Sequence, residues 1–287
     1  NNDNTALGYT AGTAITTGTN NTIMGSFAGD ALTDADYNTA IGVSSLGTDT
    51  KGDQSTAIGY AALGSQNLTS VTTTYNTAVG ANAGYAITTG VNNTIMGHSA
   101  GDALTDADFN VAIGVNALTA DTLGSHSVAV GYGALAQQNF TSATNSLNVA
   151  IGNNAGYALT TGTSNTFVGN GAGDGTDDGI HNVAVGDQAL SANCGNQNVA
   201  IGQSANAYGT GEHNTVIGYF AGGQLSSGSR NIIIGHESGS NLFSNGIFQC
   251  TTHNDRIIMG TTEATHAYIE VEWTVTSDAR DKTSITD

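Results

Sequence analysis

The pattern of apolar and polar positions along this chain repeats one short phrase, which is clearest in residues 76–80 with the sequence Asn-Thr-Ala-Val-Gly. In each copy a polar residue is followed by three β-branched, aliphatic or small residues and then by a closing glycine. Most steps between closing glycines are 17 residues, and two are 21. Three steps of 17 and one of 21 make a 72-residue super-repeat that starts at residues 4, 76 and, less faithfully, 148. The closing glycines are Gly8, Gly25, Gly42, Gly59, Gly80, Gly97, Gly114, Gly131, Gly152, Gly169, Gly186, Gly202, Gly218, Gly235 and Gly260.

This pattern predicts an all-β fold of short strands. No segment spaces its apolar residues at the helical period over the length that a helix needs, and a unit of 17 residues is too short for two packed helices. A second apolar segment follows each phrase, as in 83–87 and 155–159, and a polar turn such as 160–163 follows that segment. We therefore predict two strands and two turns per unit, which together form one coil of a β-solenoid, or β-roll.

Coils of this kind stack at the ordinary strand spacing of about 4.7 Å, so about fourteen coils give a rod about 65 Å long. The closing glycine suits a corner that needs a positive φ or a close approach of backbone. Asn opens most phrases, and Ser55 and Ser127 replace it in two. This residue suits a turn whose side chain bonds the neighbouring backbone or forms a ladder with its copies.

The strands of such a coil have two faces, and one chain has only one interior to hide them in. Alternation puts the first and third strand residues on one face and the small second residue on the other. The apolar composition predicts strands that are buried on both faces. We therefore expect sister chains to cover the second face, in an intertwined or side-by-side homotrimer.

The period predicts three regions along the chain. We assign residues 1–240 to the solenoid and residues 241–276 to a C-terminal β cap or neck, because the 17-residue period ends near residue 240. The cap includes the cleanly alternating segment 267–276, and a terminal cap protects the exposed edge that a repeat would otherwise leave. Residues 277–287 are assigned to the start of a further domain.

The composition narrows the possible partners. The chain has 287 residues with 5 basic and 23 acidic side chains, a net charge of −18, and no proline. This charge argues against nucleic acid or an anionic membrane as a direct partner. No run of eighteen apolar residues is present, so we expect no membrane insertion. No catalytic grouping, phosphate loop or Cys/His zinc pattern appears, so we expect no cofactor and no turnover of a substrate.

Residues 277–285, with the sequence Ser-Asp-Ala-Arg-Asp-Lys-Thr-Ser-Ile, resemble a segment of a known domain. They are similar to the start of the intramolecular chaperone found at the C-terminus of endosialidase-type phage tail spikes and many phage tail fibres. The resemblance implies a chaperone that aligns three chains and then cleaves itself between Ser277 and Asp278. It implies Ser277 as the nucleophile and Lys282 as its assistant, which requires a lysine whose pKa is lowered by burial.

The repeated phrase is also similar to the left-handed β-rolls in the heads of trimeric autotransporter adhesins, which use a shorter repeat. The chaperone resemblance implies a phage tail fibre: a trimeric rod on the virion that joins other tail proteins and attaches to host cell-surface glycan or protein. The adhesin resemblance implies a trimeric adhesin or extracellular filament subunit on the bacterial cell surface. We take the tail fibre as the main hypothesis and the bacterial protein as the alternative.

Two insertions, at 65–75 and 137–147, lengthen the 21-residue units, and they are the expected place for receptor contacts. Loops on a rigid scaffold commonly carry binding, since the coil can bulge there without disturbing its core. The candidate contact residues are Gln66, Asn67, Tyr75, Gln138, Asn139 and Phe140.

Two further features raise the question of a metal site. Acidic turns at 30–36, 102–108 and 174–178 supply the oxygen ligands that Ca²⁺ prefers, but Asp also starts turns and no complete twelve-residue calcium loop is present. We therefore predict no metal site. His98 and His236 take the place after the closing glycine that Tyr holds in other units, and neither has a second metal ligand at a useful spacing.

The tyrosines and threonines leave alternatives open. The Tyr residues that follow closing glycines either form a sugar-stacking stripe or wedge between coils, and the sequence does not choose between these two arrangements. The Thr-rich turns also suit a flat ice-binding array, which the 21-residue units interrupt in every fourth coil.

Overall fold

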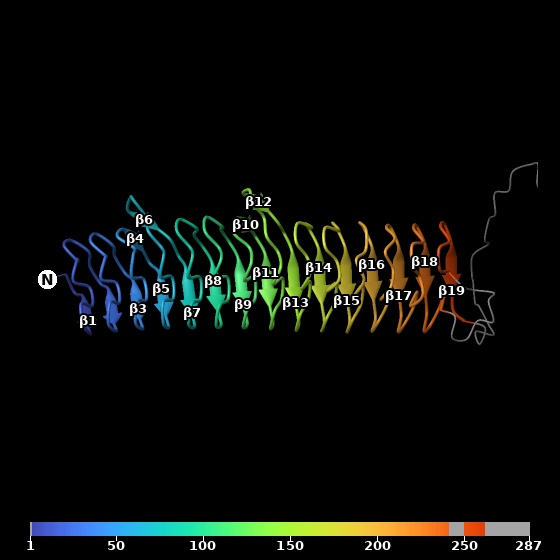
Figure 1. Cartoon of the computed structure of the whole chain (residues 1–287), viewed down its shortest axis with the longest axis horizontal. Helices are drawn as coiled ribbons and strands as arrows, with labels where there is room; N and C mark the ends of the chain where they lie inside the picture. The colour runs from blue at the N-terminus through green and yellow to red at the C-terminus, as the bar shows by residue number, and fades with distance from the viewer. Residues whose placement is uncertain (1, 241–249, 262–287) are drawn as a thin grey trace, which may run out of the picture.

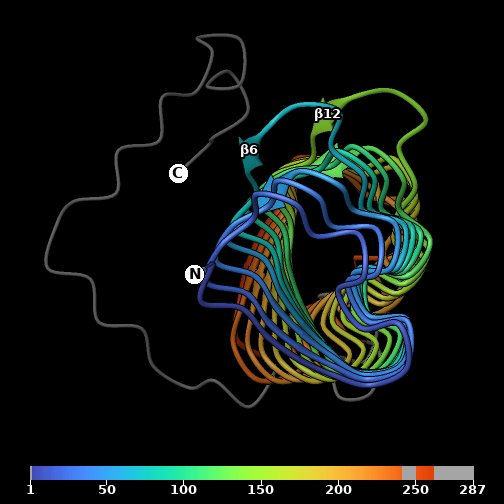
Figure 2. The same ribbon diagram turned by 90° about the vertical axis from the view of Figure 1, so that its left-hand side faces the viewer.

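The structure is a computed structural model that describes residues 2–240 and 250–261. In these residues the chain winds into a stack of similar coils along one axis (Figure 1), and the coils superimpose around a common interior when viewed along that axis (Figure 2). The predicted all-β solenoid of about 14 turns is confirmed, and the described residues contain no helix. The predicted segment 267–276 and the predicted cleavage residues Ser277, Asp278 and Lys282 lie outside the described residues.

One parallel sheet of fifteen strands runs the length of the stack. Each three-residue strand pairs in register with its equivalent in the next coil, so that Ala40 lies beside Ala57. The strands are β1 (Thr5–Leu7), β2 (Thr22–Met24), β3 (Thr39–Ile41), β5 (Thr56–Ile58), β7 (Thr77–Val79), β8 (Thr94–Met96), β9 (Val111–Ile113), β11 (Val128–Val130), β13 (Val149–Ile151), β14 (Thr166–Val168), β15 (Val183–Val185), β16 (Val199–Ile201), β17 (Thr215–Ile217), β18 (Ile232–Ile234) and β19 (Ile257–Met259). β19 falls in the range predicted as a cap, yet it pairs with β18 in the same parallel register and forms one more rung.

The two 21-residue coils add short strands at the insertions. β4 (Gly52–Asp53) pairs with β6 (Thr72–Thr73), and β10 (Gly124–Ser125) pairs with β12 (Thr144–Asn145). In Figure 2 the segments around β6 and β12 project beyond the outline that the other coils share. The extra residues are therefore accommodated outside the stack, and the main sheet keeps its register through both insertions.

The interior of each coil is narrow, and the second strand residue points into it. Ala40 and Ala57 are fully buried there, and so is the much larger Phe167. Phe167 fits because glycines lie beside it: a Cβ added at Gly156 or Gly173 would come within 2.9 Å or 2.6 Å of its ring. The usual alanine follows from the small space that a coil of this length encloses.

The asparagine that opens each phrase has its side chain inside the coil. Oδ1 of Asn165 accepts a hydrogen bond from the backbone N–H of Asn182 in the next coil at 2.8 Å, and Nδ2 of Asn165 donates to the carbonyl of Gly179 at 2.8 Å. Asn148 makes the equivalent contacts with Asn165 and with Gly162. Both side chains close their own coil and bond to the next one, whereas Asn182 makes only the bond to the next coil. The predicted asparagine ladder is therefore confirmed.

The closing glycines lie where successive coils approach too closely for a side chain. Gly80 has a φ of +138°, and a Cβ at this position would lie 2.5 Å from the carbonyl oxygen of Gly97 in the next coil. Backbone atoms cannot move aside as the end of a side chain can. The predicted corner role of these glycines is therefore confirmed.

The second segment of each coil is not a strand, which corrects the prediction of two strands per unit. In the segment 83–87 and just before it, Asn82 and Gly84 both have a φ of 58°, a left-handed conformation that interrupts an extended chain. The N–H of Gly84 donates to Ala100 in the next coil, whereas the N–H of Tyr85 turns back to Asn82. The segment is thus a run of turns that still bonds from coil to coil.

The fourth residue after the closing glycine selects between two ways of filling the interior. Where it is glycine, as at Gly101, the apolar side chain comes from Leu104, whose Cδ1 would lie 2.9 Å from a Cβ at residue 101. Where it is leucine, as at Leu118, that side chain fills the space and Asp121 takes the place of Leu104. The coils with Leu46, Leu63, Leu118 and Leu135 thus bury a polar residue at this place, namely Asp49, Gln66, Asp121 and Gln138.

The ladder makes a direct prediction about stability. Asn165→Ala leaves the N–H of Asn182 and the carbonyl of Gly179 without their side-chain partner. An unpaired buried group costs about 1–3 kcal/mol, so we expect a clearly lower midpoint in thermal melts followed by circular dichroism. Asn153→Ala is the control, because Asn153 is exposed, and its effect should stay within about 0.5 kcal/mol. Equal melting of the two variants would contradict this role of the ladder.

Candidate functional site

The third strand residues form a continuous strip of aliphatic side chains along the outer face of the main sheet, which we call the apolar strip. This residue is Leu, Ile, Val or Met in every strand of the main sheet, and it leaves Met24 42%, Ile151 41% and Ile201 39% exposed. The first strand residue shares the outer face and is Thr in eight of the fifteen strands. On the inner face of the same strands, Ala150 and Ala200 are fully buried. The chain therefore buries only one face of its sheet, and the predicted burial of the other face is not met within one chain.

Two columns of exposed residues border the apolar strip, one after the closing glycines and one before the opening asparagines. The first column holds Tyr60 and Tyr132, which are 61% and 55% exposed. Ring contacts run along both columns: His236 stacks on Tyr219 with centroids 5.2 Å apart, and His126 stacks on Phe109 at 5.0 Å. The exposure of the tyrosines places them on the surface and not between the coils.

The acidic turns use their carboxylates as acceptors between coils. Asp36 accepts from the backbone N–H of Thr19 at 2.6 Å, and Asp108 accepts from the N–H of Val91 at 2.7 Å. Within residues 2–240 and 250–261, no group of three or more His, Cys, Asp or Glu side chains is placed to hold a metal ion. The geometry thus assigns Asp36 and Asp108 to coil-to-coil bonding.

The six predicted contact residues lie in two different environments. Three of them are exposed: Asn67, Tyr75 and Asn139. The other three have relative exposures of 0%, 0% and 6%: Gln66, Gln138 and Phe140. Because these three side chains lie in the interior, they are not available to a receptor, and their prediction as contact residues is corrected.

The buried glutamines replace the asparagine that the 21-residue coils lack. Ser127 is too short to span the interior, and Gln138 lies beside it. Nε2 of Gln138 donates to Oγ of Ser127 at 2.9 Å and to Oδ2 of Asp121 at 2.6 Å, while its Oε1 accepts from Nδ2 of Asn148 at 2.8 Å. The first super-repeat contains the same relay, formed by Ser55, Gln66, Asp49 and Asn76.

Asp121 holds the base of the second insertion. Its Oδ1 accepts from the backbone N–H groups of Gly124 at 3.0 Å and Phe140 at 3.1 Å. Burial raises the pKa of Asp121 above its usual value, and the hydrogen bonds from Gln138 and the backbone oppose this increase. One buried carboxyl group thus ties the start of the insertion to the preceding coil.

No protein-family model, curated protein or solved structure matches this chain. In the part of the chain that the structure describes, no helix has the length and apolar character needed to cross a bilayer.

The relay predicts a pH-dependent loss of stability when the glutamine is removed. Gln138→Ala takes a donor from Asp121, whose pKa is already raised, so the folded state holds the proton more strongly than the unfolded state. The stability deficit against the parent should then grow as the pH rises from the usual carboxyl range near about 4 toward about 7. At the upper end of this pH range, the loss in the free energy of unfolding should reach about 2 kcal/mol or more, because a buried charge loses a hydrogen-bond partner.

Thermal melts at several pH values measure this effect. The neighbouring residue Gln137 is exposed, and Gln137→Ala provides the matched control with little change at any pH. A deficit for Gln138→Ala that does not depend on pH would show that the carboxylate is not the cause.

Proposed function

We propose that this chain is the rod of a phage tail fibre or tail spike, and that three copies assemble to attach the virion to a host surface. The observation that carries the proposal is the apolar strip. A contiguous apolar surface of this length marks an interaction site. The resemblance of residues 277–285 to a chaperone that aligns three chains supports the phage assignment and the number three. The same resemblance is the basis for proposing one self-cleavage, at Ser277–Asp278, and no other chemistry.

The area of the strip suits a stable interface. The outer face of fifteen strands at about 4.7 Å, each about 10 Å long, covers about 650 Å², and this area includes the first strand residue, which is Thr in eight strands. Stable protein interfaces bury about 800 Å² on each partner, and exposed side chains of the bordering columns, such as Tyr60, Phe109 and Tyr132, add to the area. Aromatic residues are also enriched at such interfaces.

The closed coils favour a side-by-side arrangement over an intertwined one. Each described coil has its own interior, with its asparagine bonded to its own last turn and to the next coil of the same chain. No strand position in the main sheet is left for a sister chain between consecutive coils. Three complete rods that pack their apolar strips around a common axis satisfy both faces of every strand.

Attachment is assigned to the surfaces that face away from that axis. The two insertions are four coils apart, which is about 19 Å along the rod, and three chains multiply each contact. Weak individual contacts to host glycan or protein then add up to strong attachment. The exposed candidates there are Asn67 and Asn139, together with the tips at 69–71 and 141–143, whereas the exposed Tyr75 lies in the column that borders the apolar strip.

Native mass spectrometry tests the assembly. We expect a mass of three chains for the parent and single chains for the double variant Ile151→Lys, Ile201→Lys, because two lysines in each strip place six charges in the apolar interface. Circular dichroism should show that the variant keeps its coils. Thr161→Lys, at an exposed turn, is the control and should remain trimeric. A stable single chain in the parent would overturn the trimer.

Adsorption of phage particles to host cells tests the attachment role. Replacing the exposed tips 69–71 and 141–143 with glycine leaves the apolar strip and the Asp121 relay intact, so the rod should fold and assemble. We expect slower adsorption, by about tenfold if the tips carry the main contacts. Unchanged adsorption would show that these insertions serve only as spacers.

A further inference from the structure

One outward column of side chains, at the fifth position after each closing glycine, alternates between large and very small residues. In four successive coils of the first super-repeat it contains Asp30, Gly47, Gly64 and Tyr85. In the second super-repeat the same column contains Asp102, Thr119, Ala136 and Tyr157. The surface is therefore hollow over two coils, between an acidic residue on one side and a tyrosine on the other.

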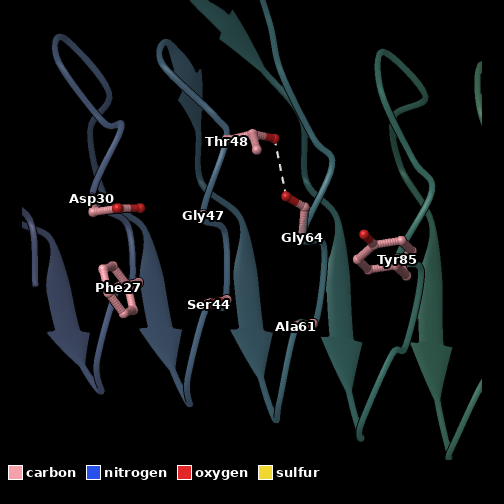
Figure 3. Close-up of a pocket in the computed structure, with 8 residues that line it drawn as sticks. All are labelled: Phe27, Asp30, Ser44, Gly47, Thr48, Ala61, Gly64 and Tyr85. Atoms are coloured by element: carbon pink, nitrogen blue, oxygen red, sulfur yellow. Dashed lines mark hydrogen bonds between the residues drawn. The ribbon is translucent and has the colours of Figure 1, made fainter.

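The hollow in the first super-repeat, which we call the Tyr85 groove, has a volume of about 340 Å³ (Figure 3). Phe27 and Asp30 form one end, Tyr85 forms the other, and Gly47 and Gly64 lie between them. The groove crosses four coils, a length of about 14 Å. Its volume lies at the lower end of the range of about 300–1,000 Å³ typical of small-molecule sites.

Aromatic rings stand at both ends of this groove. Tyr85 is 48% exposed and Phe27 is 44% exposed. The Tyr85 ring lies against Gly64, where an added Cβ would come within 3.0 Å of the ring carbon Cε2. Glycine at residue 64 thus lets the ring lie close to the groove floor. An exposed ring in this position offers an apolar surface on which one face of a pyranose ring can pack.

Asp30 and Thr48 in the groove keep hydrogen-bond acceptors that no described residue occupies. The carboxylate of Asp30 accepts no hydrogen bond from any described residue, whereas its counterpart Asp102 accepts one from the Thr119 hydroxyl at 2.6 Å. The difference arises because Gly47 occupies the place of Thr119. Thr48 donates to the carbonyl of Gly64 at 3.0 Å, and its oxygen still has a free lone pair (Figure 3).

The charge of the groove indicates which ligands it can accept. Its only charged lining residue is Asp30, and no Lys or Arg side chain lines it. An anionic ligand would therefore meet a carboxylate without a compensating cation. Vicinal hydroxyl groups of a neutral sugar, in contrast, are donors that a carboxylate accepts well.

We propose that the Tyr85 groove binds a short neutral oligosaccharide, with one sugar ring packed on Tyr85 and hydroxyl groups donated to Asp30. This inference rests on the proposed attachment function and adds to it a site away from the insertions. The groove lies along the side of the rod, so a glycan chain parallel to the axis can occupy it.

The second super-repeat provides an internal comparison. The equivalent hollow at Tyr157 has a volume of only about 150 Å³, because Thr119 and Ala136 replace the two glycines. Asp102, the acidic residue of this column, does not line the smaller hollow and is bonded to Thr119. The third copy of the column has Gly223 where tyrosine is expected. The Tyr85 groove is therefore the strongest site of the three, and a single substitution can convert it toward the weaker form.

Titration of the purified chain with neutral trisaccharides tests the proposal. The probes are trisaccharides of glucose, galactose, mannose and N-acetylglucosamine, with sialyllactose as the anionic comparison, and saturation-transfer NMR and calorimetry detect binding. We expect at least one neutral probe to bind at millimolar concentration or below. Tyr85→Ala should weaken it about tenfold, which corresponds to loss of a well-packed ring.

Two further variants separate the groove from general surface effects. Gly47→Thr should also weaken binding, because it introduces the hydroxyl that occupies Asp102 in the second super-repeat. Tyr208→Ala removes a tyrosine that is 63% exposed and lies outside the groove, and it should leave the affinity unchanged. Melting temperatures show whether each variant is folded.

The results distinguish this inference from the fibre assignment. Failure of every neutral probe, tighter binding of sialyllactose, or an affinity that Tyr85→Ala does not change would each overturn the groove. A trimer that binds no sugar would leave the fibre assignment standing. A single chain that binds a neutral sugar through Tyr85 would overturn the trimer and keep the groove.

Discussion

The side-chain amide of the opening asparagine is the interaction on which the rest of the structure depends. It pairs a strand-entry N–H of the next coil and a turn carbonyl of its own coil, two buried backbone groups that the sheet itself does not satisfy. Most coils present this amide at the same place in the interior. The 21-residue coils place a glutamine there with different partners, since Gln138 bonds to the side chains of Ser127, Asn148 and Asp121 and not to backbone groups. The longer coils therefore keep an amide in the interior but use it to join side chains.

The period, the strand, the closing glycine and the asparagine could all be predicted from the sequence, because each has a distinctive residue type that recurs at one step. The turns of the second segment could not. Residues such as Leu46 and Leu118 adopt a φ of 51° and 54°, which leucine rarely does and which no local propensity signals. Bonding to the neighbouring coils imposes this conformation. Position in the stack, and not residue preference, decides the structure there.

The candidate contacts show the same limit. Gln66 and Gln138 occur in insertions and are polar, so their composition favours exposure, yet both are fully buried. A signal for their role was present, since both 21-residue coils replace Asn with Ser and place a Gln eleven residues later. Recognising it requires knowing that the opening side chain points inward. The Tyr85 groove could not be predicted from the sequence either, because equivalent residues of four successive coils form it together.

The interior and the surface of this rod are under separate constraints, and the 72-residue duplication makes this visible. Duplication copied the ladder, the glycine corners and the buried relay with almost no change, since each is tied to the coil above and below. The outward column changed freely: Gly47 and Thr119 occupy equivalent places, and only the second bonds to its neighbouring aspartate. That hydrogen bond satisfies Asp102 within the fold, whereas the Asp30 carboxylate accepts no hydrogen bond from the described residues. Few contacts within the stack depend on its outer residues. A single substitution can therefore change a surface site and leave the core unchanged.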